Sequence, residues 1–371
     1  MRFTCEKNML VTGLNIAGRT VAQKSSLSVI EGILCKAGQG LSLTGYNMET
    51  AITYEIDADV SDMGQCILPA KLFGDIIRRL PEGSVTVVVD ENYKVSIRAG
   101  YASFTISAEA AEDYPELPDV DGEAAVRMSQ QDLKKLINGT IFAVSDNESR
   151  PIHTGSLFEI DDTGLTVVSV DGYRLALRHE PITERDGALS FSFVVPGSAL
   201  SEVEKICGDG EEEATVTQGE RHVMFRVGDT MLVSRRLEGE FLAYRQAIPR
   251  NNGIKVEGDT RALLTSIDRV SLIISDKLKS PLRCVFDDNV LKITTKTGIG
   301  DASDQCPISG DGGGLEIGFN NRYLMDALKA APADRVRLEL SSGVAPCVIL
   351  PAEGEENFLY MVLPVRLKAG E

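Results

Sequence analysis

The stretch Ile67–Phe73, which reads ILPAKLF, has the pattern of a buried β-strand that ends at a proline or a polar residue and is followed at once by a helix. The same pattern returns at Val194–Leu200 (VVPGSAL) and at Ile317–Tyr323 (IGFNNRY), at intervals of about one third of the 371-residue chain. Self-similarity at a fixed period indicates a repeat architecture, so the sequence predicts three domains of one fold. The three domains are expected at 1–121, 125–248 and 250–371.

Each expected domain also has an earlier helix, which follows a short alternating strand. In the second domain, Val126–Met128 leads into the helical pattern of Asp132–Ile137. The later helix of the first domain is expected to bury one apolar stripe, formed by Leu72, Phe73, Ile76, Ile77 and Leu80. Alternating runs at 85–89 and 95–97 flank a hairpin turn at 91–92. The sequence therefore predicts an α+β fold in which each repeat packs two helices on antiparallel sheets.

Composition indicates the cellular compartment and the redox environment of the protein. The chain contains no run of about 18 apolar residues and no basic-then-apolar leader, so we expect a cytoplasmic protein without a membrane span. The seven cysteines stand far apart in the sequence, which argues against zinc clusters, redox motifs and a disulfide framework. Buried free thiols are expected instead.

Few residues have the pattern of an active site. None of the three histidines is placed for a metal site or a catalytic triad. The glycine cluster Gly310–Gly314 leads into a strand and not into a helix, so we expect a flexible turn there and no phosphate site. The acidic pairs Asp161–Asp162 and Asp287–Asp288 lie between apolar runs and are expected to form hairpin turns. The sequence predicts a protein that is not an enzyme and that uses no metal or cofactor.

The charge distribution is uneven. A net charge of −17 argues at first against nucleic-acid binding, because phosphate contacts require Lys and Arg. The acidic runs, such as Glu211–Glu213, lie outside the six candidate helices, which together carry a small positive net charge. This separation is compatible with a DNA-facing helical surface, and also with charges that only keep the protein soluble.

Three segments that the repeat does not require resemble a known family. They are 170–176 (VDGYRLA), 113–118 (DYPELP) and 361–367 (MVLPVRL). Together with the threefold repeat, they resemble the bacterial DNA polymerase III beta subunit family, the DNA sliding clamps, over essentially the whole chain. The resemblance implies a ring of two head-to-tail subunits that encircles duplex DNA, slides on it without sequence preference and tethers the polymerase for processive replication.

The resemblance also implies roles for individual residues. DNA contact is expected from Lys24, Arg78, Arg79, Lys134, Lys135 and Arg150. The subunit seam is expected to join apolar edge segments at 102–106 and 272–274. At this homodimer seam, Phe104 and Ile106 of one subunit would contact Ile273 and Ile274 of the partner subunit.

For partner proteins, the resemblance implies an apolar pocket on the third domain, at its seam with the second, for a short peptide with apolar anchors. The lining residues are expected to be Gly172, Tyr173, Arg174, Leu175, Leu242, Ala247, Asn320, Tyr323, Val344, Met361, Leu363, Pro364, Val365, Arg366 and Leu367. Expected partners are the replicative polymerase alpha subunit, the clamp loader delta subunit and other proteins with clamp-binding motifs. His153, Val170 and Leu242 differ from the usual family residues, and we expect them to shift the peptide preference.

Two other classes compete with this interpretation. An enzyme with a site in a cleft between domains would need clustered His, Cys or carboxylates, which are scattered in this chain. A three-repeat protein-binding scaffold would share the fold but would have no role with DNA. The tail at 368–371 continues past the family's usual terminal leucine, and it is expected either to extend freely or to cover part of the pocket.

Overall fold

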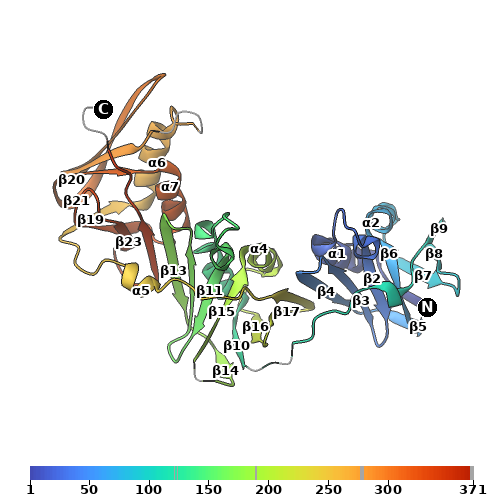
Figure 1. The fold of residues 1–371 in the computed structure, drawn as a ribbon. Helices are drawn as coiled ribbons and strands as arrows, with labels where there is room; N and C mark the ends of the chain where they lie inside the picture. Colours follow the sequence, from blue (N-terminus) through green and yellow to red (C-terminus); the bar gives the residue numbers. More distant parts are fainter. Residues whose placement is uncertain (121, 123, 189, 276–279, 368–371) are drawn as a thin grey trace. The chain divides into compact units, whose positions relative to one another are not determined.

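The computed structural model describes residues 1–120, 122, 124–188, 190–275 and 280–367, so the tail at 368–371 lies outside the described residues (Figure 1). The chain forms two compact units. Unit 1 comprises 1–133, 182–188 and 201–236, and unit 2 comprises 134–181, 189–200 and 237–371. The three repeats follow one another in element order, and the middle repeat contributes to both units.

The first repeat packs two helices on antiparallel strands. Its strands are β1 (Arg2–Glu6), β2 (Gly32–Ala37), β3 (Leu41–Tyr46), β4 (Thr50–Ile56), β5 (Asp59–Asp62), β6 (Gly64–Pro69), β7 (Ser84–Val89), β8 (Lys94–Ala99) and β9 (Ala102–Ser107), and its helices are α1 (Lys7–Ala17) and α2 (Ala70–Arg79). In α2, Phe73, Ile76 and Ile77 are buried, which confirms the predicted amphipathic helix. The prediction that Leu72 belongs to the buried stripe is wrong, because a hollow beside the first turn leaves this side chain 50% exposed.

The other two repeats follow the same order. The second repeat contains β10 (Ala124–Ser129), α3 (Gln130–Asn138), β11 (Gly155–Ile160), β12 (Leu165–Val170), β13 (Arg174–Glu180), β14 (Glu184–Asp186), β15 (Phe191–Pro196), α4 (Gly197–Ile206), β16 (Glu213–Gln218), β17 (His222–Val227) and β18 (Thr230–Arg235). The third contains β19 (Ile254–Asp259), α6 (Thr260–Ser271), β20 (Leu282–Thr297), β21 (Gly300–Phe319), α7 (Asn321–Ala330), β22 (Arg335–Leu340), β23 (Cys347–Pro351) and β24 (Phe358–Val362), after a one-turn helix, α5 (Tyr244–Ala247). No helix in the described ranges is long and apolar enough to cross a membrane.

The two predicted acidic turns are both present. Between β11 and β12, the backbone N–H of Asp161 donates to the carbonyl of Gly164. The strand β20 pairs with β21 on both sides of Asp288, where its register shifts, and its two arms lie close together, since the Thr295 hydroxyl donates to the Pro281 carbonyl at 3.1 Å. The chain reverses near Asp287–Asp288, where Asn289 has a φ of 56° in the left-handed region that Asn tolerates.

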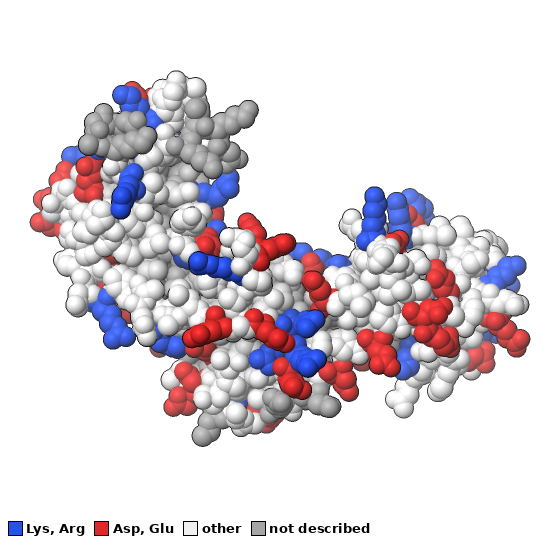
Figure 2. Space-filling view, viewed as in Figure 1, with Lys and Arg blue, Asp and Glu red and all other residues white. Residues whose placement is uncertain are grey.

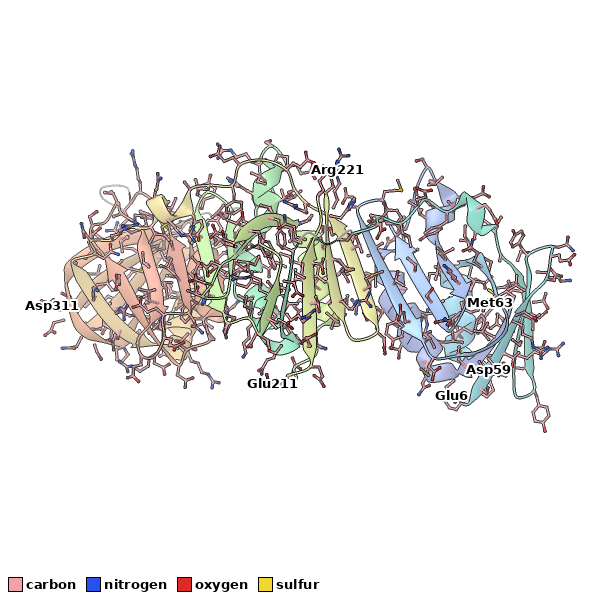
Figure 3. The ribbon with its side chains drawn as sticks, turned by 90° about the horizontal axis from the view of Figure 1, so that it is seen from below. Glu6, Asp59, Met63, Glu211, Arg221 and Asp311 are labelled. Carbon is pink, nitrogen blue, oxygen red and sulfur yellow. The ribbon has the colours of Figure 1, made fainter. Side chains whose placement is uncertain are left out.

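The glycine cluster at 310–314, predicted to be a turn, forms a bend inside the long strand β21. Gly310, Gly313 and Gly314 have φ angles of 114°, 62° and 69°, which only glycine adopts without strain. These angles bend the strand without ending its hydrogen bonding to β20. Asp311 lies on the outer surface of the bend (Figure 3).

The strands form three antiparallel sheets, with the orders β5-β1-β7-β8-β9, β14-β10-β16-β17-β18-β4-β3-β2-β6 and β15-β11-β12-β13-β24-β23-β22-β19-β21-β20. Two strand pairs cross repeat boundaries. In unit 1, β18 of the second repeat pairs with β4 of the first, and in unit 2, β24 of the third repeat pairs with β13 of the second. At the edges of the five-stranded sheet lie β9 and β5. The β5 edge carries Asp59 (Figure 3) and Asp62. Their charge discourages further pairing.

All seven cysteines are buried and free, as predicted. Cys35 and Cys66 lie directly opposite each other on β2 and β6. Burial raises the pKa of Cys5 and of Cys284 to about 12, so these thiols stay protonated at neutral pH. The cysteines therefore pack as small apolar side chains.

Candidate functional site

Most of the residues predicted to bind a partner peptide lie together in unit 2. They come from the turn between β12 and β13, from the first turns of α7 and from the chain that follows β24. The amide of Leu363 donates to the Tyr173 carbonyl at 2.9 Å, which ties the chain end to the turn. Asn320 caps α7, because its side-chain oxygen accepts from the amide of Arg322 at 2.9 Å. The sequence thus predicted an arrangement that joins the second and third repeats.

Arg174 is the central connection in this arrangement. Its guanidinium forms ion pairs with Asp171 at 2.9 Å and with Asp326 of α7 at 2.6 Å, while only 11% of its side chain is exposed. It also lies over two rings, 4.6 Å from the centre of Tyr323 and 5.4 Å from that of Phe142. Charge-assisted hydrogen bonds and cation–π contacts are strongest where water is excluded. Arg174 therefore fixes the β12–β13 turn against α7.

Two tyrosines form an aromatic face beside Arg174. The rings of Tyr173 and Tyr323 stack with centroids 5.9 Å apart and planes 21° apart. Tyr173 is 61% exposed, whereas Tyr323 is half-buried. Burial, together with the Asp171 carboxylate, raises the pKa of Tyr323, so its hydroxyl stays protonated. An exposed aromatic face on a fixed base suits an apolar peptide side chain.

An apolar cluster lies beneath this face. Leu175 and Met361 are opposite each other on β13 and β24 and are 1% and 6% exposed. They pack with Val170 and Tyr244, and partly buried Phe241 covers the cluster. Leu175 and Met361, which were predicted to line the pocket, are thus buried in the cluster beneath the tyrosine face.

The segment after β18 borders the cluster. Leu242 is 43% exposed and Ala247 is also exposed, so both are available to a ligand. Between them, Tyr244 donates to the Glu159 carboxylate at 2.5 Å, and Arg245 pairs with the same carboxylate at 2.8 Å. Burial and this hydrogen bond raise the pKa of Tyr244. These contacts hold α5 on β11.

Several other predicted lining residues differ from expectation. Val344 lies in the turn between β22 and β23, and not in a strand, and is 78% exposed. Val365 forms a bridge with Gly318, and Leu367 lies against the same glycine. Leu367 lines a separate hollow of about 440 Å³ with Pro281 and other residues of β20 and β21. Gly172, Pro364 and Arg366 remain accessible at the surface.

Three contributors were missed by the sequence analysis. Phe142 and Asp326 contact Arg174, and Phe241 meets the ring of His153 edge-on at 5.7 Å. Burial and the positive charge of Arg150 lower the pKa of His153, so this imidazole is neutral at pH 7. The spacing of Tyr323 and Asp326, three residues apart on one helix, could have revealed Asp326.

The predicted DNA-contacting residues of unit 1 lie on or near two neighbouring helices. Arg78 of α2 donates to Asn15 of α1 at 3.2 Å. Arg78 and Arg79 are both exposed, and each forms a weak ion pair with Asp75. Lys24 is exposed in the loop that follows α1. Figure 2 shows Lys and Arg side chains above α1 and α2, whereas Asp and Glu gather over the strands of this repeat.

The remaining predicted DNA contacts belong to unit 2. Lys134 and Lys135 are half-buried on α3, and Arg150 is exposed in the segment before β11. These two lysines interact with neighbouring protein groups, so they are less accessible than Arg78 and Arg79. Among the described residues, no group of three or more His, Cys, Asp or Glu is placed to hold a metal ion.

The predicted seam residues lie at an edge strand and in a turn. Phe104 is 40% exposed on β9, and half-buried Ile106 packs against the core of the first repeat. Ile273 and Ile274, of the predicted edge segment 272–274, lie in the turn that follows the end of α6. Leu272, the first residue of the predicted segment 272–274, is 80% exposed.

Comparison with known proteins covers the whole chain. Models of the N-terminal, central and C-terminal domains of the DNA polymerase III beta subunit match residues 1–118, 127–242 and 245–366. The beta sliding clamp of Staphylococcus aureus (strain Mu50) is 31% identical over 377 residues, which cover 99% of each chain. The beta sliding clamp of Halalkalibacterium halodurans is 30% identical and covers 99% of this chain and 100% of that protein.

Solved structures agree with this relationship. A DNA polymerase III beta subunit described as putative, from Eubacterium rectale, is 32% identical with a TM-score of 0.93, over 98% of this chain and 99% of that one. The DNA polymerase sliding clamp from Bacillus subtilis is 28% identical with a TM-score of 0.94, over 99% and 100%. These matches do not favour a scaffold without a role with DNA. The chain belongs to the DNA polymerase III beta subunit family, and it is a DNA sliding clamp of replication, a processivity factor and not an enzyme.

Proposed function

We propose that this clamp closes as a head-to-tail homodimer around duplex DNA in the cytoplasm. It would tether the replicative polymerase alpha subunit, the clamp loader delta subunit and other proteins with clamp-binding motifs. The observation that carries the partner-binding part is the aromatic face of Tyr173 and Tyr323 fixed by Arg174. A related clamp, from Pseudomonas aeruginosa, has a structure bound to griselimycin, with 27% identity, a TM-score of 0.93 and coverage of 99% and 100%.

The peptide would place its apolar anchors against the tyrosine face and Leu363. Leu363 and Pro364 are half-buried beside the β12–β13 turn, and Leu242 is exposed near the same cluster. Arg366 is exposed and supplies positive charge for an acidic or polar peptide group. Because Leu175 and Met361 support this surface from below, they would act through packing and not by contact.

The subunit seam follows from the two strand pairs that already join repeats within the chain. In both pairs, the last strand of one repeat pairs with the fourth strand of the repeat before it. These pairs are β18 with β4 and β24 with β13. The last strand of the first repeat is β9, which has only β8 beside it in the described residues. The matching strand in the third repeat is the start of β21, which follows the hairpin tip at Ile299. We therefore pair β9 with Gly300–Cys306 of the partner subunit, an arrangement that closes both edges.

Duplex DNA would slide past the helices, whose basic side chains would attract its phosphates only weakly. Arg78 and Arg79 share one acidic neighbour, Asp75, and keep exposed guanidinium groups for phosphates. A ring holds DNA by topology, so a few screened contacts are enough and sliding stays free.

The test compares closed circular with linear duplex DNA. The protein is loaded on nicked circular DNA by a bacterial clamp loader with ATP, and bound protein is separated by gel filtration. Retention on the circle and release after a single restriction cut support the proposal. Equal retention on the intact circle and on the circle cut after loading would contradict it.

A further inference from the structure

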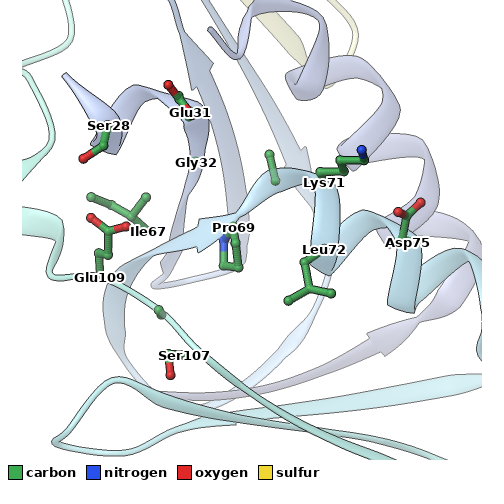
Figure 4. Close-up of a pocket in the computed structure, with 12 residues that line it drawn as sticks. Ser28, Glu31, Gly32, Ile67, Pro69, Lys71, Leu72, Asp75, Ser107 and Glu109 are labelled. Carbon is green, nitrogen blue, oxygen red and sulfur yellow. The ribbon is translucent and has the colours of Figure 1, made fainter. Parts of the chain in front are cut away.

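The first repeat contains a hollow of about 490 Å³ that no role described above uses. It lies between the first turn of α2, the start of β2 and the segment that follows β9 (Figure 4). Pro69 lies between its two sides, with Leu72 on the α2 side and Ser107 on the other (Figure 4). Leu72 is 50% exposed, so this side chain leaves apolar area uncovered at the rim.

The threefold repeat relates this hollow to the proposed peptide surface of the third repeat. In each repeat, an isolated bridge joins the strand before the second helix to the segment after the last strand; the three bridges are Ile67 to Glu109, Val194 to Leu237 and Gly318 to Val365. The helix begins three residues after the first member of each bridge. Ser107–Glu109 therefore correspond to Leu363–Val365, and Leu72 corresponds to Tyr323. The hollow is the first repeat's counterpart of the proposed peptide surface.

The second repeat does not keep this surface. The residue of α4 that corresponds to Leu72 and Tyr323 is Ala199, which is 1% exposed. Val144 and the Thr154 carbonyl lie close against the start of that helix, within 3.2 Å of a Cβ placed on Gly197. Only the first and third repeats thus present a large apolar side chain at this helical position.

The charge of the hollow differs from that of the third repeat. Its lining contains the carboxylates of Glu31, Asp75 and Glu109 and one cation, Lys71. Asp75 is partly neutralised by the two arginines of α2, but Glu31 and Glu109 are exposed. The third-repeat surface instead exposes Arg322 and Arg366. Charge complementarity therefore favours a basic ligand in the first repeat.

A second subunit would supply the missing wall. In the third repeat, the tip of the β12–β13 hairpin places Tyr173 on Tyr323. The equivalent tip, between β20 and β21, carries Ile299, which is 70% exposed. In the proposed head-to-tail dimer, that tip belongs to the partner subunit and lies beside α2. Ile299 of the partner subunit would then meet Leu72 as Tyr173 meets Tyr323.

We propose that this hollow is a second docking site, for a short basic peptide with an aliphatic or aromatic anchor, and that the partner subunit's hairpin tip completes it. The inference rests on the proposed homodimer. The peptide anchor would lie between Leu72 and Ile67, and its flanking Lys or Arg would pair with Glu31 and Glu109. The two repeats would then select partners of opposite charge.

Fluorescence anisotropy tests this with the labelled peptide Ac-RKLFK-amide and its acidic counterpart Ac-EELFE-amide. The full-length dimer should bind the basic peptide through the first repeat, whereas the acidic peptide should bind only through the third repeat and should be weakened by Leu363→Ala. Leu72→Ala, Glu109→Gln and Ile299→Ala should each weaken binding by about tenfold. The matched control Glu91→Gln removes the same charge from a turn of the same repeat and should change nothing. Leu363→Ala should also leave basic-peptide binding unchanged.

Three results overturn the proposal. The first is that the basic peptide does not bind. If Leu72→Asp also dissociates the dimer, the partner subunit itself fills the hollow. The second is binding that Leu363→Ala removes, which would place the peptide in the third repeat. The third is an unchanged affinity in Ile299→Ala, which would remove the partner's wall from the site. Sedimentation of the wild-type protein tests the proposed ring independently, because a monomer would refute the ring. Peptide binding by the Leu72 and Glu109 variants would still test the hollow.

Discussion

Replacing Asp326 with Asn should loosen the proposed peptide surface of the third repeat. Asp326 and Arg174 meet at 2.6 Å, with side chains 28% and 11% exposed. A hydrogen bond to a charged group contributes about 1.5 to 3 kcal/mol, and partial exposure of the carboxylate lowers this to about 1 to 2 kcal/mol. Arg174 would keep Asp171 but lose its anchor on α7, so the β12–β13 turn would be less ordered before binding. Peptide affinity should fall about 5- to 30-fold.

Calorimetric titration of a Gln-x-x-Leu-x-Phe-like peptide measures this loss. Asp326→Asn, Arg174→Gln and the double variant form a cycle, whose coupling energy should be about 1 kcal/mol because the two groups touch. Asp268→Asn, an exposed acid on α6, is the matched control and should leave affinity unchanged. Near-UV circular dichroism verifies that each variant keeps its tertiary packing. Additive effects of the two single variants would refute the positioning role of this ion pair.

Three further outcomes are expected. Arg78→Ala with Arg79→Ala should speed the sliding of the loaded clamp along DNA at low salt, as measured by single-molecule fluorescence, and an unchanged diffusion coefficient would remove α2 from the DNA path. His153 has a lowered folded-state pKa, so its contribution to stability is present above about pH 6.5 and is lost as pH falls through the folded pKa. In urea unfolding, His153→Phe should therefore lose less free energy of unfolding than the wild-type protein between about pH 7 and pH 5. An equal loss in the two proteins would contradict this. Ile273→Asp with Ile274→Asp should give monomers in analytical ultracentrifugation at micromolar concentration, because the seam cannot solvate the added charge, and a persistent dimer would place the seam elsewhere.

The repeat and its helices were predictable from local patterns. The strand–proline–helix signature at Ile67–Phe73 and the apolar spacing in α2 depend on contacts near in sequence, which periodicity reports directly. The turn at Asp287–Asp288 was predictable for the same reason, since Asp and Asn favour reversal of the chain. The family resemblance added the loop at 170–176, whose role no periodicity reveals.

Exposure was harder to predict, because it depends on distant parts of the chain. Leu72 fits the buried stripe of α2 by spacing, but the segment after β9 leaves a hollow beside it. Leu175 and Met361 were predicted to line an apolar pocket, and their nearly complete burial beneath the tyrosine face depends on the pairing of β13 with β24. Ile273 and Ile274 have the apolar character of an edge strand, yet they follow the C-terminus of α6. In each case, the exposure or the secondary structure of the residue depended on tertiary packing, which composition does not report.

The most direct test of the sliding-clamp mechanism is retention on DNA of different topology. Labelled protein is loaded on nicked circular duplex, the ATP and loader are removed, and the DNA is cut once while bound protein is followed by gel filtration. Topological tethering predicts stable retention on the circle in high salt and loss from the cut ends within the time of the digestion. If retention is the same before and after the cut but falls as salt is raised, the protein binds DNA by ordinary electrostatic attraction. That result would contradict a closed ring around the DNA.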